Sequence, residues 1–148
     1  MERYGKKLAA AMIILCVCLT GCRDTRGYKD GYYTAQTAEY NHGYKEYVCI
    51  LIKNNHIISV EFNAKDYSGY IKSWDNSYMN LMKSAQGTYP NEYTRNYASQ
   101  LVESQDIEKV DAVTGATNSG KNFVKLVEAA LANAAKGNQE VAVVAASE

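Results

Sequence analysis

Apolar and polar residues alternate through much of the first half of the chain. Ile58, Val60 and Phe62 fall on one side of such a stretch, and polar residues fall on the other. Two stretches before it are rich in aromatic and β-branched residues and are bounded by residues that favour turns. Asn54-Asn55 fits a two-residue hairpin turn, because asparagine tolerates the positive φ angles of that turn. The pattern predicts an antiparallel meander of three strands, at 32–40, 44–53 and 56–65.

The middle of these three stretches is apolar on both faces. Residues 48–52 are Val, Cys, Ile, Leu and Ile, with no polar side chain between them. A run of this kind favours a central strand that is covered on both sides. Cys49 would then be a buried and inert thiol.

After about residue 70 the apolar residues recur at intervals of three and four, which is typical of helices. Ser73 suits the N-cap of a first helix, and Gly87 would end it. Pro90 suits the first position of a second helix. The segment 107–113 is predicted to be short and extended. The apolar stripes are Trp74, Tyr78, Leu81, Met82 and Ala85 in the first helix, and Tyr93, Tyr97 and Leu101 in the second.

The strongest helical pattern lies near the end of the chain, over residues 119–136. Residues 137–148 contain no aromatic anchor and are predicted to form a flexible tail. The resulting fold class is α+β, a small antiparallel meander sheet packed with helices in a single domain at 32–136. The apolar face of the last helix consists of Phe123, Leu126, Val127, Ala130, Leu131 and Ala134.

The first 22 residues have the pattern of an export signal. A basic start is followed by 12 apolar residues, Leu8–Leu19, whereas a membrane-spanning helix needs roughly 20. The run ends in Leu19-Thr20-Gly21-Cys22, which resembles the lipobox of bacterial lipoproteins. That resemblance implies a signal peptide at 1–21, lipidation of Cys22, and a lipidated tether at 22–31 on the extracytoplasmic face of the cell membrane. The alternative is an ordinary signal peptide that contains a cysteine.

Charge excludes one class of partner. The full chain has 16 basic and 16 acidic residues, and the segment that follows the signal has 13 and 15. A nucleic-acid-binding protein needs a clustered excess of Lys and Arg, so no nucleic-acid partner is expected. No group of His, Cys and carboxylate residues has the spacing of a metal site, and no catalytic acid–base pair is evident.

The residues with distinctive chemistry lie in the nine-residue motif 111–119, just before the last helix. Gly115 permits a special turn or a close approach of the backbone to a ligand, and Ala116 leaves space there. Thr114, Thr117 and Ser119 add hydroxyl groups. The N-terminus of a helix has unpaired N–H groups that favour anions. The motif therefore suits a phosphate-bearing ligand.

Each of these residues also has a purely structural alternative. Thr117 or Ser119 would serve as a helix cap, Asp111 would cap a turn, and Gly115 would form the corner between an extended segment and the helix.

Residues 111–119 resemble the flavinylation motif Asp-x-x-Ser/Thr-Gly-Ala-Thr of the FMN-binding domain family. The similarity extends from about Gly27 to Ala135. The family includes flavin-carrying subunits of the Na⁺-translocating quinone reductase and Rnf-type complexes, and small lipoproteins related to a spirochaete immunogen. Thr114 stands where Ser is common, and Asn118-Ser119 departs slightly from the usual residues.

The resemblance implies a covalent cofactor. A flavin transferase would use FAD to attach FMN to Thr117 through a phosphoester, and Asp111 would contribute to what the transferase recognises. The expected cofactor-binding residues are Asp111, Thr114, Gly115, Ala116, Thr117 and Ser119.

The leading hypothesis is thus a membrane-anchored FMN flavoprotein that relays electrons between unidentified redox partners and is no self-sufficient enzyme. One alternative is a lipoprotein that holds FMN or another phosphorylated ligand without a covalent bond. Another is a structural or immunogenic surface lipoprotein whose motif is a relic.

Overall fold

The computed structural model describes residues 27–147. The predicted signal peptide at 1–21, the predicted lipidation residue Cys22 and the first part of the predicted tether lie outside the described residues. Within the described part, no helix is long and apolar enough to span a bilayer.

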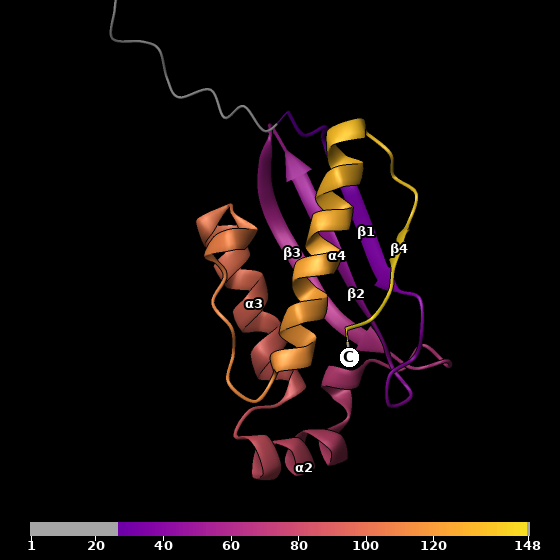
Figure 1. The fold of residues 1–148 in the computed structure, drawn as a ribbon, viewed down its shortest axis with the longest axis vertical. Helices are drawn as coiled ribbons and strands as arrows, with labels where there is room; N and C mark the ends of the chain where they lie inside the picture. Colours follow the sequence, from indigo (N-terminus) through magenta and orange to yellow (C-terminus); the bar gives the residue numbers. More distant parts are fainter. Residues whose placement is uncertain (1–26, 148) are drawn as a thin grey trace, which may run out of the picture.

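A four-stranded sheet carries two long helices on one face (Figure 1). The strand order is β3-β2-β1-β4, in which the first three strands are antiparallel and β4 runs parallel to β1. The strands are β1 Gly31–Thr37, β2 Lys45–Lys53, β3 His56–Lys65 and β4 Ala142–Val144. The helices are α2 Asn76–Gln86, α3 Pro90–Ser104 and α4 Thr117–Lys136, with short 3₁₀ turns η1 Lys72–Trp74 and η2 Ile107–Lys109.

The core lies between the sheet and helices α3 and α4. Phe123 of α4 packs on Phe62 of β3 and Tyr97 of α3, with ring centroids 4.9 and 5.3 Å apart. Leu101, Leu126, Val127 and Ala130 are fully buried around them. The predicted α+β class, the three-strand meander and the main helical stripes are therefore confirmed.

Turn residues behave as the sequence indicates. Asn54 and Asn55 have φ angles of 51° and 64° in the hairpin between β2 and β3. Pro90 is the first residue of α3, and Gly87 ends α2 with a positive φ.

The sheet differs from the prediction on its outer face. β2 is central, but only alternate residues, Val48 and Ile50 among them, are buried. Cys49 points the other way and is half-buried, because the helices cover one face only. A register shift between Leu51 and Ile52 also changes the phase of β3, so that Ile58 is 50% exposed while Val60 and Phe62 keep the inward side.

The first helix is also different. Asp75, not Ser73, caps α2 by accepting the Tyr78 N–H at 2.9 Å. The predicted stripe is divided, because Trp74 lies in η1 and is 64% exposed, Leu81 of α2 is 70% exposed, and Met82 packs against the core. The segment predicted to be extended, 107–113, begins with the η2 turn because the Asp106 carboxylate accepts the Glu108 N–H.

Both ends of the described chain are held on the domain. The predicted flexible tail contains β4, and the Ser147 N–H donates to Asn122 Oδ1 at 2.6 Å. Residues of the predicted tether are bound as well, since the Lys29 N–H donates to the Ala134 carbonyl at 3.0 Å. Within the segment 137–148, for which the sequence predicts a loose tail, residues 142–147 are thus bound to β1 and α4.

We expect Phe123→Ala to lower the free energy of unfolding by about 3–5 kcal/mol, because the change leaves a cavity between helix and sheet. Val124→Ala is the matched control on the same helix, because Val124 is 36% exposed and the effect should stay within about 0.5 kcal/mol. Urea unfolding followed by circular dichroism measures both values. Equal losses would contradict the assignment of Phe123 to the core.

Candidate functional site

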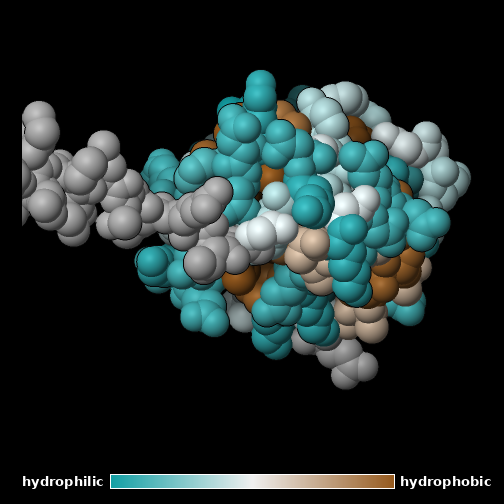
Figure 2. Space-filling model, turned by 90° about the horizontal axis from the view of Figure 1, so that it is seen from above, coloured by the Kyte–Doolittle hydropathy of each residue, from teal (hydrophilic) through white to brown (hydrophobic). Residues whose placement is uncertain are grey.

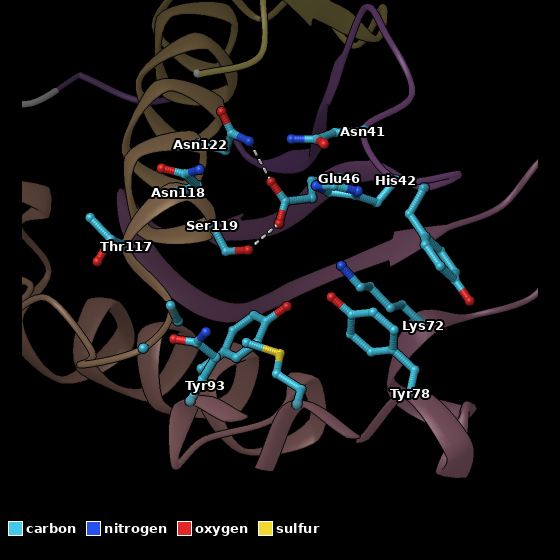
Figure 3. A pocket seen from close by; sticks show the side chains of 15 residues that line it. Asn41, His42, Glu46, Lys72, Tyr78, Tyr93, Thr117, Asn118, Ser119 and Asn122 are labelled. Carbon is cyan, nitrogen blue, oxygen red and sulfur yellow. Dashed lines mark hydrogen bonds between the residues drawn. The ribbon is translucent and has the colours of Figure 1, made fainter. Parts of the chain in front are cut away.

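A pocket of about 320 Å³ lies at the N-terminal end of α4. Its walls come from the chain just before and at the start of β2, from η1 and α2, from Tyr93 of α3, and from residues 115–122 (Figure 3). Elements distant in sequence therefore meet around it. The volume is in the range of small-molecule sites, about 300–1,000 Å³.

The structure brings four of the six predicted cofactor-binding residues to this pocket. Gly115, Ala116, Thr117 and Ser119 are in its lining. Thr114 and Asp111 are exposed and lie outside the lining. Asp111 is placed through its backbone, whose N–H donates to Gln100 Oε1 at 2.7 Å.

Gly115 is required by the local packing of the backbone. Its φ is +81°, in the region that side chains disfavour. A Cβ atom at this position would also collide with the Gln86 carbonyl oxygen at the end of α2. Gly115 therefore forms the turn between the first part of the motif and α4, and it lets the end of α2 pack close to this turn.

The first turn of α4 has free donors. The N-cap is Ala116, which has no side chain able to cap. Among the described residues, none accepts a hydrogen bond from the backbone N–H groups of Thr117, Asn118 or Ser119. Thr117 is thus the first helical residue and not the cap, and its side chain is exposed. Unpaired N–H groups and the positive end of the helix dipole attract an anion at this position.

Glu46 of β2 holds the next turn of the helix. Its two carboxylate oxygens accept hydrogen bonds from the Ser119 hydroxyl and the Asn122 amide, each at 2.5 Å (Figure 3). The side chain of Ser119 is therefore occupied, and it does not cap the helix. Sequence reasoning missed Glu46, because it precedes Ser119 by 73 residues and belongs to no motif.

Aromatic side chains form much of the remaining wall. Tyr44, Tyr78 and Tyr93 line the pocket together with Lys72 and Met82. Burial, with a contribution from the nearby Glu46 carboxylate, raises the pKa of the Tyr93 phenol above its usual value, although the Ser119 hydroxyl opposes this shift. Burial and the hydrogen bond to Asp75 likewise raise the pKa of Tyr44. Both phenols therefore stay neutral at physiological pH.

The pocket combines an anion site with an aromatic wall. FMN matches both features, because it carries a phosphate at one end and a planar ring system at the other. The free N–H groups at Thr117–Ser119 suit the phosphate, and the tyrosines suit the ring. Among the described residues, no cluster of His, Cys, Asp and Glu side chains could hold a metal ion.

The fold is a small α+β domain, and its pocket joins a helix start that attracts anions to an aromatic wall. Comparison with known families matches residues 41–132 to the FMN-binding domain family. The chain belongs to this family, as the motif at 111–119 indicated.

Two known proteins are similar over most of the chain. A 15 kDa lipoprotein of Treponema pallidum is 30% identical over 128 residues, which are 85% of this chain and 91% of that protein. A crystal structure of a Clostridium perfringens protein matches with a TM-score of 0.76 and 34% identity. The match covers 81% of this chain and 99% of the Clostridium perfringens chain. The second comparison supports the single-domain α+β fold.

Gly115→Ala should destabilise the domain more than Gly87→Ala. Both glycines have a positive φ, but a Cβ at Gly87 would meet no atom within 4 Å, whereas at Gly115 it would meet the Gln86 carbonyl. We expect a loss of about 1 kcal/mol for Gly87→Ala and of about 2 kcal/mol or more for Gly115→Ala. Thermal and urea unfolding measure both values, and a smaller loss at Gly115 would contradict the packing described here.

Proposed function

We propose that this protein is a membrane-anchored, extracytoplasmic flavoprotein that carries electrons, with FMN joined to Thr117 through a phosphoester. Membership of the FMN-binding domain family supports FMN as the cofactor. The observation that carries the proposal is the position of Thr117, whose exposed hydroxyl is in the pocket lining beside three unpaired N–H groups.

The other hydroxyls of the motif are less suitable. The Ser119 hydroxyl donates to Glu46, and Thr114 is outside the pocket lining. The Thr117 hydroxyl has no hydrogen-bond partner among the described residues, so an incoming enzyme can reach it. This difference singles out Thr117.

The proposed attachment of FMN is a phosphoryl transfer from FAD. The Thr117 oxygen bonds to the phosphorus of the FMN half, the bond between the two phosphates breaks, and AMP leaves. The hydroxyl proton goes to a base of the flavin transferase, because threonine is a poor nucleophile and no base among the described residues forms a hydrogen bond with it. The product has one negative charge, which the start of α4 stabilises.

The protein's own residues would then bind and orient the flavin. Unpaired N–H groups would hold the phosphate, and the tyrosine wall would pack against the ring. The bound ring supplies one- or two-electron transfer. The redox partners are unidentified, and the domain would act as a carrier between them.

The position of the N-terminal end fits a tethered carrier. Lys29 is bound to Ala134 near the end of α4, whereas the pocket is at Thr117. Seventeen residues of helix separate these positions, which is about 25 Å at about 1.5 Å per residue. Seen from the Lys29 end, the surface of the described chain is mainly hydrophilic (Figure 2). A lipid on Cys22, as the similar Treponema lipoprotein suggests, would leave the pocket directed away from the membrane.

Thr117→Ala should abolish covalent flavin when the protein is produced together with a flavin transferase. Ser77→Ala is the control, because it removes an exposed hydroxyl outside both the motif and the pocket lining. Intact mass and in-gel flavin fluorescence after denaturation measure the attachment. Both side chains are exposed, so each change should alter the free energy of unfolding by no more than about 0.5 kcal/mol. Full denaturation-resistant fluorescence in Thr117→Ala would exclude this residue as the attachment site.

Cys22→Ser should release the protein from membranes or leave the precursor uncleaved. Cys49→Ser is the control, because Cys49 is a free cysteine on the sheet and has no part in the lipobox. Fractionation with a carbonate wash, together with electrophoretic size, measures membrane attachment and processing. A processed Cys22→Ser protein that stays in the membrane would rule out a lipid on this residue.

A second candidate function is the binding of FMN or another phosphorylated ligand without a covalent bond. The three unpaired N–H groups favour it, because they attract a phosphate whether or not Thr117 reacts. In that case the native protein would lose its flavin on denaturation and regain it from solution. Failure to acquire flavin by either route would instead favour a structural or immunogenic surface lipoprotein.

A further inference from the structure

Lys72 has a mostly buried side chain whose ammonium group has no ionic partner among the described residues. The residue is only 8% exposed, although it carries a charge in the η1 turn. Among the described residues, no carboxylate forms an ion pair with its ammonium group. The Nζ atom itself is not sealed from solvent, because every fully buried polar side-chain atom among the described residues has a hydrogen-bond partner and Nζ has none. Lys72 therefore presents an uncompensated positive charge to the pocket, while its aliphatic part is buried.

Two tyrosines position the ammonium group. The Nζ atom lies 5.1 Å from the ring centroid of Tyr44 and 4.6 Å from that of Tyr78. The Tyr44 hydroxyl donates to Asp75 Oδ2 at 3.1 Å, which fixes the ring. The aromatic faces attract the cation but carry no net charge, so they leave its positive charge in place.

The ammonium group is directed into the pocket. Lys72 and Tyr78 lie on the side opposite Thr117 (Figure 3). The carboxylate in the lining, Glu46, is engaged with Ser119 and Asn122. The pocket thus has two places that attract negative charge, the first turn of α4 and the Lys72 ammonium group, on opposite walls.

We propose that Lys72 sets the redox potential of the flavin by stabilising the negative charge that the ring gains on reduction. This inference rests on the proposed function. With the phosphate held at Thr117, the ring extends toward the opposite wall, where Lys72 lies between tyrosine faces. Two electrons from a reduced donor and one proton from solvent leave the ring with one additional negative charge. Lys72 favours that state and so raises the midpoint potential.

The test compares flavin-loaded proteins by spectroelectrochemical titration. Lys72→Met should lower the stability of the reduced flavin relative to the oxidised flavin by tenfold or more. For a two-electron couple, tenfold corresponds to a decrease of about 30 mV. Lys72→Arg keeps the charge and should stay close to the parent protein. Lys72→Gln removes the charge with a polar side chain and is the second variant if Lys72→Met folds poorly.

Lys83→Met is the matched control. The Lys83 ammonium group also lies over a tyrosine ring, 5.4 Å from the centroid of Tyr89, but Lys83 is exposed and outside the pocket lining. Its substitution should leave the potential unchanged. Equal shifts for Lys83→Met and Lys72→Met would overturn the proposal, because they would indicate a general effect of net charge.

The outcomes separate this inference from the proposed function. Normal flavin loading with an unchanged potential in Lys72→Met and Lys72→Gln would overturn the role of Lys72 and leave the proposed function intact. If Lys72→Met bound oxidised FMN more weakly but bound riboflavin normally, and its potential were unchanged, Lys72 would contact the phosphate. That result would also overturn the proposed role of Lys72 in setting the potential. A parent protein that never acquires flavin would overturn the proposed function, and this inference with it.

Discussion

The Tyr97 side chain connects the core of the domain to the pocket, and the geometry of the site depends on it. Its ring stacks on Phe123 with an interplanar angle of 25°, and its hydroxyl accepts the Val113 N–H at 2.9 Å. The same hydroxyl lies so close to Gly120 that a Cβ atom there would collide with it. The chain before α4 is therefore held against the core on one side, while the Gln86 carbonyl limits Gly115 on the other. These contacts keep the first turn of α4 at the pocket, with its N–H groups uncapped and Thr117 accessible.

Local chemistry made much of this fold predictable from the sequence. The Asn54-Asn55 turn, the start of α3 at Pro90 and the buried stripe of α4 depend on neighbouring residues only, and such signals are readable in the chain itself. The differences arise from contacts between distant segments. The register shift at Leu51 and Ile52 changes which residues of β3 face the core, and β4 pairs with the open edge of β1. No pattern within 56–65 or 137–148 contains that information.

In the candidate site, too, the residues of the local motif were predictable, whereas those brought in by distant segments were not. The motif places Gly115, Ala116, Thr117 and Ser119 in one pocket, since they are consecutive or nearly so at a helix start. Glu46 and Lys72 were missed, because their roles depend on where β2 and η1 meet α4 in space. A lysine is ordinarily a surface residue, and only the burial of Lys72 between Tyr44 and Tyr78 marks it as unusual.

The charges around α4 also bear on why a covalent bond would be useful. Glu46 is bonded to Ser119 and Asn122, close to the place where a phosphate would bind. A carboxylate in this position repels a free phosphate, and thereby reduces the affinity that the helix start alone would give.

The pocket is also small and open along the exposed Thr117 side, so it buries only part of a ligand as large as FMN. A phosphoester at Thr117 would remove the need for affinity, because the ligand could not leave, and it would reduce the negative charge of the phosphate that Glu46 repels. With the proposed bond to Thr117 keeping the cofactor in place, the pocket would be free to bind the ring in a way that favours electron transfer, and Lys72 would act on the reduced state.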